Sequence, residues 1–96
     1  MELTVGPHII TVLSGPEIDL ELAEKQVTGE SDVERLTIKV RSDLPQSVRH
    51  EVLCHEILHH VFGLTHLAAR WSDEEQEEVI RAVSPYLSQA VSIFPA

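Results

Sequence analysis

Residues 46–62 constrain the fold of this chain more than any other segment, because they predict a long helix without a fully polar side. Leu53 and Ile57 share one face of that helix, and Phe62 lies on another. A helix that is apolar on several sides is surrounded by other elements instead of lying across the surface. A chain of 96 residues holds at most one domain, so we expect residues 1–96 to form a single domain around this helix.

The first half of the chain predicts a small sheet. Residues 5–13 are mostly β-branched and apolar, as in a buried strand, and residues 33–40 alternate in the manner of a half-buried strand. Residues 17–26 favour a short helix or an irregular crossing, and residues 28–32 have turn-forming side chains. We therefore expect an α+β fold, in which a small antiparallel N-terminal sheet packs against the buried helix and a C-terminal helix.

Three sequence signals predict where helices end, begin or bend in the second half of the chain. Gly63 is expected to end the buried helix. Ser72 and Glu75 have the S-x-x-E spacing of a capping box, which predicts that the next helix begins there. Pro85 falls inside the apolar pattern of that helix and is expected to kink or shorten it.

Charge and cysteine content exclude several classes of function. The net charge is −9, which disfavours binding to nucleic acid and to anionic membranes. Cys54 is the single cysteine, so no disulfide can form within the chain, and we expect a small buried hydrophobic residue at this position. The N-terminal residues do not resemble a secretion signal, and no stretch is apolar enough to span a membrane. We therefore expect a cytoplasmic protein.

The buried helix carries the sequence HEILH at residues 55–59, an H-E-x-x-H motif. Because His55 and His59 are four residues apart, both imidazoles project from one face and can reach one zinc ion. Glu56 points about 100° away from His55, so it can face a zinc-bound water and act as a general base. The competing interpretation is a pair of core histidines that hydrogen-bond to the backbone.

A zinc site of this kind needs a third protein ligand. His66 is one candidate, but its spacing from His59 fits no H-E-x-x-H-x-x-G-x-x-H pattern, and an exposed loop histidine is the simpler interpretation. The other candidate is a carboxylate on the following helix. The apolar periodicity of that helix does not decide which of Glu75, Glu77 and Glu78 faces the histidines.

The motif and a downstream glutamate together resemble the gluzincins, the thermolysin clan of zinc metallopeptidases. The chain is similar in particular to the minimal soluble and phage-encoded members, the minigluzincins. Their pattern matches the strand at residues 36–40, the helix containing HEILH, and a last helix whose E-x-apolar-apolar form matches residues 77–83 and points to Glu77. The match departs at Arg81, where thermolysin-type enzymes have an Asp that orients a zinc histidine.

The resemblance implies a zinc-dependent peptidase, an endopeptidase, whose metal ligands are His55, His59 and Glu77 and whose general base is Glu56. It also implies that the strand at residues 33–40 is an edge strand that pairs with an extended peptide substrate. An ordinary sheet strand is the competing interpretation. The alternative function is a non-catalytic binding or regulatory domain that keeps zinc for stability. A metal-dependent nuclease is disfavoured by the net charge. Candidates for stabilising the transition state are Tyr86, His60 and His66.

Overall fold

A four-stranded sheet and three helices make up the computed structural model, which describes residues 1–65 and 69–90. The elements follow the chain in the order β1 (Glu2–Val5), β2 (His8–Leu13), α1 (Pro16–Glu24), β3 (Gly29–Asp32), β4 (Thr37–Val40), α2 (Gln46–Leu64) and α3 (Asp73–Ala90). The α+β class expected from the sequence is confirmed.

The sheet has the strand order β1-β2-β4-β3 and is mixed. β1 and β2 are antiparallel, as are β3 and β4, but β2 and β4 run parallel. The expectation of a wholly antiparallel sheet was therefore wrong. The reason is the connection through α1 and β3, which returns the chain to the sheet in the direction of β2, as a crossover connection does.

The strand predicted at residues 5–13 is also corrected. It is the end of a hairpin, in which Val5 of β1 pairs with His8 of β2 across a two-residue turn. Gly6 in that turn has φ +59°, a backbone conformation that glycine adopts without steric cost. β2 itself is buried on one face only, since Ile10 is fully buried whereas Ile9 is 59% exposed. The apolar sequence of residues 5–13 therefore did not predict the turn at Gly6 or the solvent-facing side of β2.

The second half of the sheet is shifted along the chain relative to expectation. Residues 28–32, predicted as a turn, contain β3, and the strand predicted at 33–40 begins only at Thr37. The turn occupies the residues between them. Asp32 Oδ1 accepts a hydrogen bond from the Arg35 backbone nitrogen at 3.2 Å, and Leu36 has φ +52°. In the strand order of the sheet, β4 is an interior strand and β3 lies at the edge.

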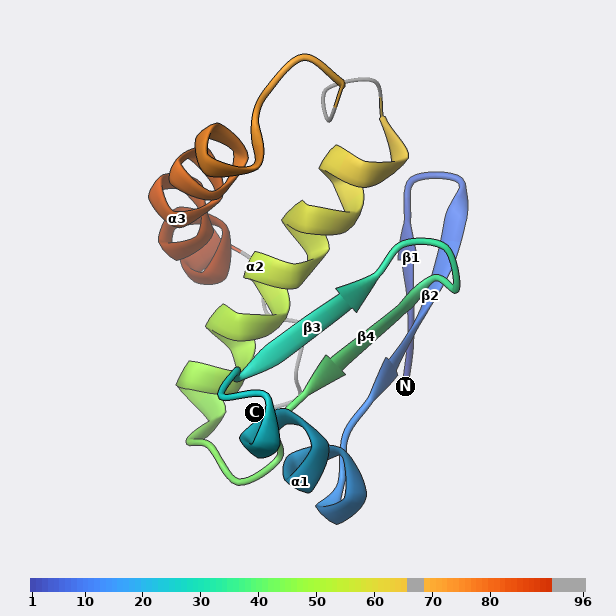
Figure 1. Cartoon of the computed structure of the whole chain (residues 1–96), viewed down its shortest axis with the longest axis vertical. Coiled ribbons are helices and arrows are strands. Elements are labelled where there is room, and N and C mark those ends of the chain that lie inside the picture. The colour runs from blue at the N-terminus through green and yellow to red at the C-terminus, as the bar shows by residue number, and fades with distance from the viewer. Residues whose placement is uncertain (66–68, 91–96) are drawn as a thin grey trace.

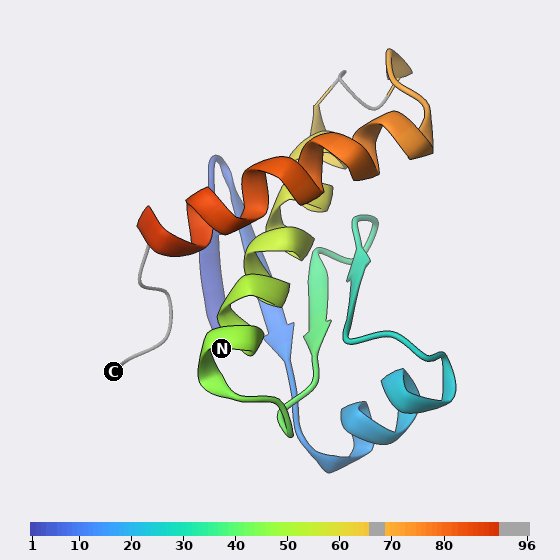
Figure 2. The same ribbon diagram turned by 90° about the vertical axis from the view of Figure 1, so that its left-hand side faces the viewer.

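Helix α2 lies across one face of the sheet, and α3 packs on α2 (Figures 1 and 2). The core between α2 and the sheet contains Ile10, Val12, Ile38, Val40 and Leu53. The sequence predicted that two C-terminal helices cover the sheet. In the described parts of these helices, α2 packs on the sheet and α3 packs on α2. The central position expected for the H-E-x-x-H helix is confirmed.

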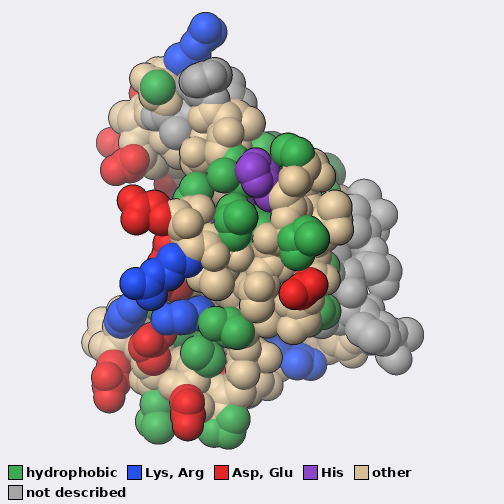
Figure 3. Space-filling view, turned by 90° about the vertical axis from the view of Figure 1, so that its right-hand side faces the viewer, with side chains coloured by type: hydrophobic (Ala, Val, Ile, Leu, Met, Phe, Trp, Pro, Cys, Tyr) green, Lys and Arg blue, Asp and Glu red, His purple; other side chains and the backbone are tan. Residues whose placement is uncertain are grey.

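The opposite face of the sheet carries scattered hydrophobic side chains among polar ones, as Figure 3 shows. Ile9 and Leu13 are exposed there. Lys39, also on this face, pairs with Glu21 at 2.7 Å. No helix among the described residues is long and apolar enough to cross a membrane.

The helix ends differ in part from the predictions. Gly63 does not end α2, which continues to Leu64. A Cβ at Gly63 would lie 2.8 Å from Val33 Cγ2, so glycine here permits close approach of the β3–β4 turn. Pro85 lies inside α3, which continues to Ala90.

The predicted capping box at the start of α3 is present. The Glu75 backbone nitrogen donates to Ser72 Oγ at 3.1 Å, and the Ser72 backbone nitrogen donates to Glu75 Oε1 at 3.2 Å. Just before it, the Trp71 ring lies 5.3 Å from the Phe62 ring, which connects this segment to α2. Together these contacts fix the point at which α3 starts beside α2.

Candidate metal centre

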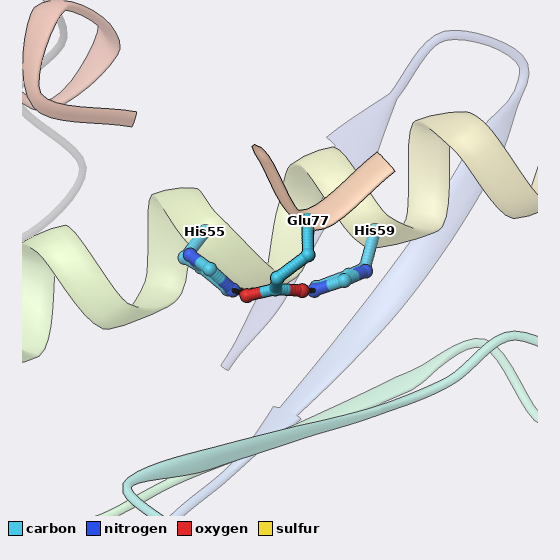
Figure 4. A group of neighbouring side chains, drawn as sticks. All are labelled: His55, His59 and Glu77. Carbon is cyan, nitrogen blue, oxygen red and sulfur yellow. Dashed lines mark hydrogen bonds and ion pairs between the residues drawn. The ribbon is translucent and has the colours of Figure 1, made fainter. Parts of the chain in front are cut away.

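Two helices bring three candidate metal ligands to one point. His55 and His59 project from one side of α2, and Glu77 reaches between them from α3 (Figure 4). His55 Nε2 lies 3.0 Å from Glu77 Oε1, and His59 Nε2 lies 3.0 Å from Glu77 Oε2. The two Nε2 atoms are 3.2 Å apart. The one-turn spacing of the histidines and the packing of α3 on α2 together produce this cluster.

The cluster fits a tetrahedral zinc ion in both chemistry and spacing. One ligand atom from each of the three residues lies within 4.8 Å of the others. Ligands placed 2.0–2.1 Å from a tetrahedral zinc are about 3.3–3.4 Å from one another, close to the separations seen here. Burial lowers the pKa of His59, although the nearby Glu77 opposes this effect. A lowered pKa favours the neutral imidazole that metal binding requires.

Glu56 lies next to the cluster without belonging to it. Its side chain is buried, with 8% of the residue exposed. Burial, followed by the negative charges of Glu77 and Glu30, raises the pKa of Glu56 to about 7. A carboxyl group with a pKa near neutrality can both accept and release a proton at physiological pH, which suits a general base that later acts as an acid.

The candidate centre opens into a cleft formed by two adjoining cavities. The larger, about 810 Å³, is bounded by α2, α3 and the segment leading into β3; its lining residues include His55, His59, Glu77, Glu56, Val48 and Gln26. The smaller, about 390 Å³, is lined by Ser31, Val33, Glu56, His59, Gly63 and Gln76. Glu56 and His59 line both, so the cleft extends to either side of the metal cluster and follows β3.

The carboxylates left open by periodicity are separated by the structure. Glu77 is the one that meets the two histidines. Glu75 is engaged in the capping box, and Glu78 is exposed and lines a different depression on α3. His66 lies outside the described residues.

Arg81 occupies the position at which the resemblance to thermolysin-type enzymes led us to look for an acidic residue. Its Nε lies 3.4 Å from Glu77 Oε1, one helical turn away, and the side chain is 75% exposed. It therefore contacts the carboxylate ligand, not a histidine. The i,i+4 spacing of a glutamate and an arginine predicts such a pair from sequence.

The remaining candidates do not join the cluster. Tyr86 is 76% exposed and is absent from the described linings of both cavities. His60 is fully buried and faces Ser31. Cys54 is a buried free thiol whose pKa is raised by burial, as expected for a small hydrophobic residue.

Sequence reasoning missed the residues that β3 and its preceding loop contribute. Gln26 and Ser31 line the cleft, yet neither belongs to a recognisable motif. Finding them requires the strand register, which a polar four-residue strand does not reveal.

No family model, curated protein or solved structure matches this chain.

Proposed function

We propose that this protein is a zinc-dependent peptidase that hydrolyses peptide bonds within extended chains. The observation that carries the proposal is the convergence of His55 Nε2, His59 Nε2 and the Glu77 carboxylate beside the buried Glu56. Two neutral imidazoles and one carboxylate are a ligand set of catalytic zinc sites, in which the fourth position stays open for water.

The proposed mechanism divides the work between the ligands and Glu56. His55, His59 and Glu77 would hold the zinc ion, which would supply Lewis acidity for a substrate carbonyl group and for water. Glu56 takes the proton of the attacking water and gives it to the leaving amine. Its pKa of about 7 suits both steps. The low exposure of Glu56 limits competition from bulk water for that proton.

The proposed substrate lies along β3. Residues 33–40 were expected to supply the edge strand, but β4 is interior and β3 is the edge. Both cavities border β3 or the segment entering it. An extended peptide could pair with this edge by strand addition, in which main-chain hydrogen bonds provide affinity. The two cavities share Glu56 and His59, an arrangement that suits a chain continuing past both sides of the cluster, so we propose endopeptidase activity.

The first test is zinc content, measured by native mass spectrometry. We expect one zinc ion per wild-type chain, and loss of that ion in His59→Ala and Glu77→Ala. Glu78→Ala is the matched control, since it removes a neighbouring carboxylate of α3 that does not meet the histidines. Retention of zinc by Glu77→Ala would show that another residue is the third ligand.

The second test is cleavage of fluorescein-labelled casein, an unstructured protein. Wild-type protein with zinc should cleave it, and chelator should stop the reaction. Glu56→Gln should keep its zinc and lose cleavage, whereas an active Glu56→Gln would contradict the assignment of the base. Zinc retention without cleavage by the wild type would instead indicate the non-catalytic, zinc-stabilised binding or regulatory domain.

We also propose a cytoplasmic location. Cys54 is buried with a free thiol, and burial raises its pKa, which keeps it unreactive. A fold without a disulfide is compatible with a reducing compartment.

A further inference from the structure

The edge strand β3 meets helix α2 through alternate residues. A Cβ at Gly29 would lie 2.6 Å from Val52 Cγ1, so only glycine allows the strand to approach this closely. Two residues later, Ser31 reaches α2 with its hydroxyl group. The period of two is that of one strand face. β3 therefore contacts the helix that carries the candidate metal ligands through Gly29 and Ser31, in addition to its pairing with β4.

Ser31 and His60 form a polar bridge at the centre of this contact. Ser31 Oγ donates a hydrogen bond to the Glu56 carbonyl oxygen at 3.2 Å. Its oxygen also contacts His60 Nδ1. With the hydroxyl proton directed at the carbonyl group, the Nδ1–H tautomer of His60 completes the second hydrogen bond. The bridge thus joins the strand to the backbone of Glu56, the proposed general base.

A histidine at position 60 is expected to lower the stability of the fold. It is fully buried, and its Nε2 has no hydrogen-bond partner among the described atoms. Burial lowers the pKa of His60, and the backbone groups of Glu56 and Asp32 only partly oppose this effect. An unsatisfied buried polar group costs about 1–3 kcal/mol, whereas an apolar side chain of similar shape would leave none. Stability alone therefore favours a leucine here, and the histidine is better explained by what it holds in place.

We infer that Ser31 and His60 are a positioning pair, which holds the substrate-pairing edge of β3 at a fixed distance from the metal cluster. This inference rests on the proposed function in one respect, namely that β3 is where the substrate lies. Ser31 and Glu56 also line the smaller cavity together, so the bridge forms part of the cleft wall. Small displacements of a substrate from its reactive position have large effects on rate and binding.

The test compares Ser31→Ala, His60→Leu and the double variant in zinc-loaded Glu56→Gln protein, whose binding can be measured without hydrolysis. Affinity for fluorescein-labelled casein is read by fluorescence anisotropy. We expect each single variant to bind about tenfold more weakly, with the double variant no worse than either, because the two residues act through one bridge. Amide hydrogen exchange should accelerate in β3 in all three.

Cys54→Ala is the matched control, because Cys54 is fully buried on the same helix and lies outside the cleft linings. It should lower stability while leaving the casein affinity within twofold. With Glu56 restored, Ser31→Ala should lower kcat/KM about tenfold, whereas Cys54→Ala should leave kcat/KM within twofold. Ser31→Ala also keeps the inference testable if His60→Leu fails to fold.

Several outcomes would overturn the inference: unchanged affinity in both single variants, an equal loss in Cys54→Ala, loss of zinc from Ser31→Ala, or no casein binding by the zinc-loaded Glu56→Gln protein. Failure of the proposed function is recognised separately. In that case the Glu56→Gln protein binds casein in a Ser31-dependent manner, but the wild type does not cleave it.

Discussion

Glu56 couples the candidate centre to the stability of the metal-free protein. Its pKa is raised from 4.5 to about 7 in the fold, by burial first and by Glu77 and Glu30 second. Between these values the folded state binds more protons than the unfolded state, so the free energy of unfolding falls as pH rises from about 5 to 7. Glu56→Gln removes this effect. We expect it to exceed the wild type by about 2–3 kcal/mol at pH 8 and to match it near pH 4.5, as measured by urea unfolding with chelator present.

The comparison between the two proteins isolates Glu56. Burial lowers the pKa values of His59 and His60, which makes stability rise with pH through the ordinary histidine range, but both proteins contain these residues. Glu51→Gln, an exposed change on the same helix, should alter stability by less than about 0.5 kcal/mol at either pH. A constant difference between Glu56→Gln and wild type across this range would contradict the prediction.

Arg81 places a cation beside the carboxylate ligand. A guanidinium at 3.4 Å from Glu77 competes with a metal ion for that oxygen and repels the ion. Because Arg81 is largely exposed, the effect is small, and we expect Arg81→Ala to tighten zinc binding about two- to fivefold. Competition with a chromophoric chelator measures this. Arg35→Ala, an exposed change near Asp32, should not alter zinc affinity, and weaker binding by Arg81→Ala would show that Arg81 instead holds Glu77 in place.

At the scale of elements, the two long helices and the presence of β2 and β4 were predictable, whereas β1, β3 and the strand bounds were not. The buried helix and the capping box each depend on neighbours within a turn or two, so a local pattern suffices to identify them. β3 has the sequence GESD, which lacks apolar alternation, because its inward contacts come from a glycine and a serine. Its position as the edge strand depends on pairing with β4, and the parallel pairing of β4 with β2 depends on a crossover that no local pattern reveals.

The close approach of β3 to α2 can be tested at Gly29. In Gly29→Ala the new Cβ would meet Val52 Cγ1 at 2.6 Å and Glu56 Cγ at 3.1 Å, so the strand or the helix must shift. Overpacking of this kind costs about 1–3 kcal/mol, which urea unfolding measures. Adding Val52→Ala should recover part of the loss, since it removes the nearest atom. A neutral Gly29→Ala would mean that the two elements are not in tight contact.

At the scale of the whole molecule, the sequence predicts those candidate ligands that are close together along the chain better than those that only the fold brings together. His55 and His59 are one helical turn apart, so the sequence identifies them as neighbours directly. Glu77 comes from another helix, and periodicity could not separate it from Glu75 and Glu78; the packing of α3 on α2 does so. The edge of the cleft was assigned to the wrong strand, because it depends on the order of all four strands.

Zinc bound at the proposed site would contribute to the stability of the fold. α3 packs on α2, and Glu77 connects it to both histidines. With free zinc about a thousandfold above its dissociation constant, the bound metal stabilises the folded state by about 4 kcal/mol. Chelator should therefore lower the thermal midpoint and accelerate amide exchange in α3 more than in β2 or β4, since the sheet keeps its core with α2. His59→Ala, which lacks a ligand, should not respond to chelator. An equal response in His59→Ala, or faster exchange spread evenly over the sheet, would show that the metal does not link the two helices.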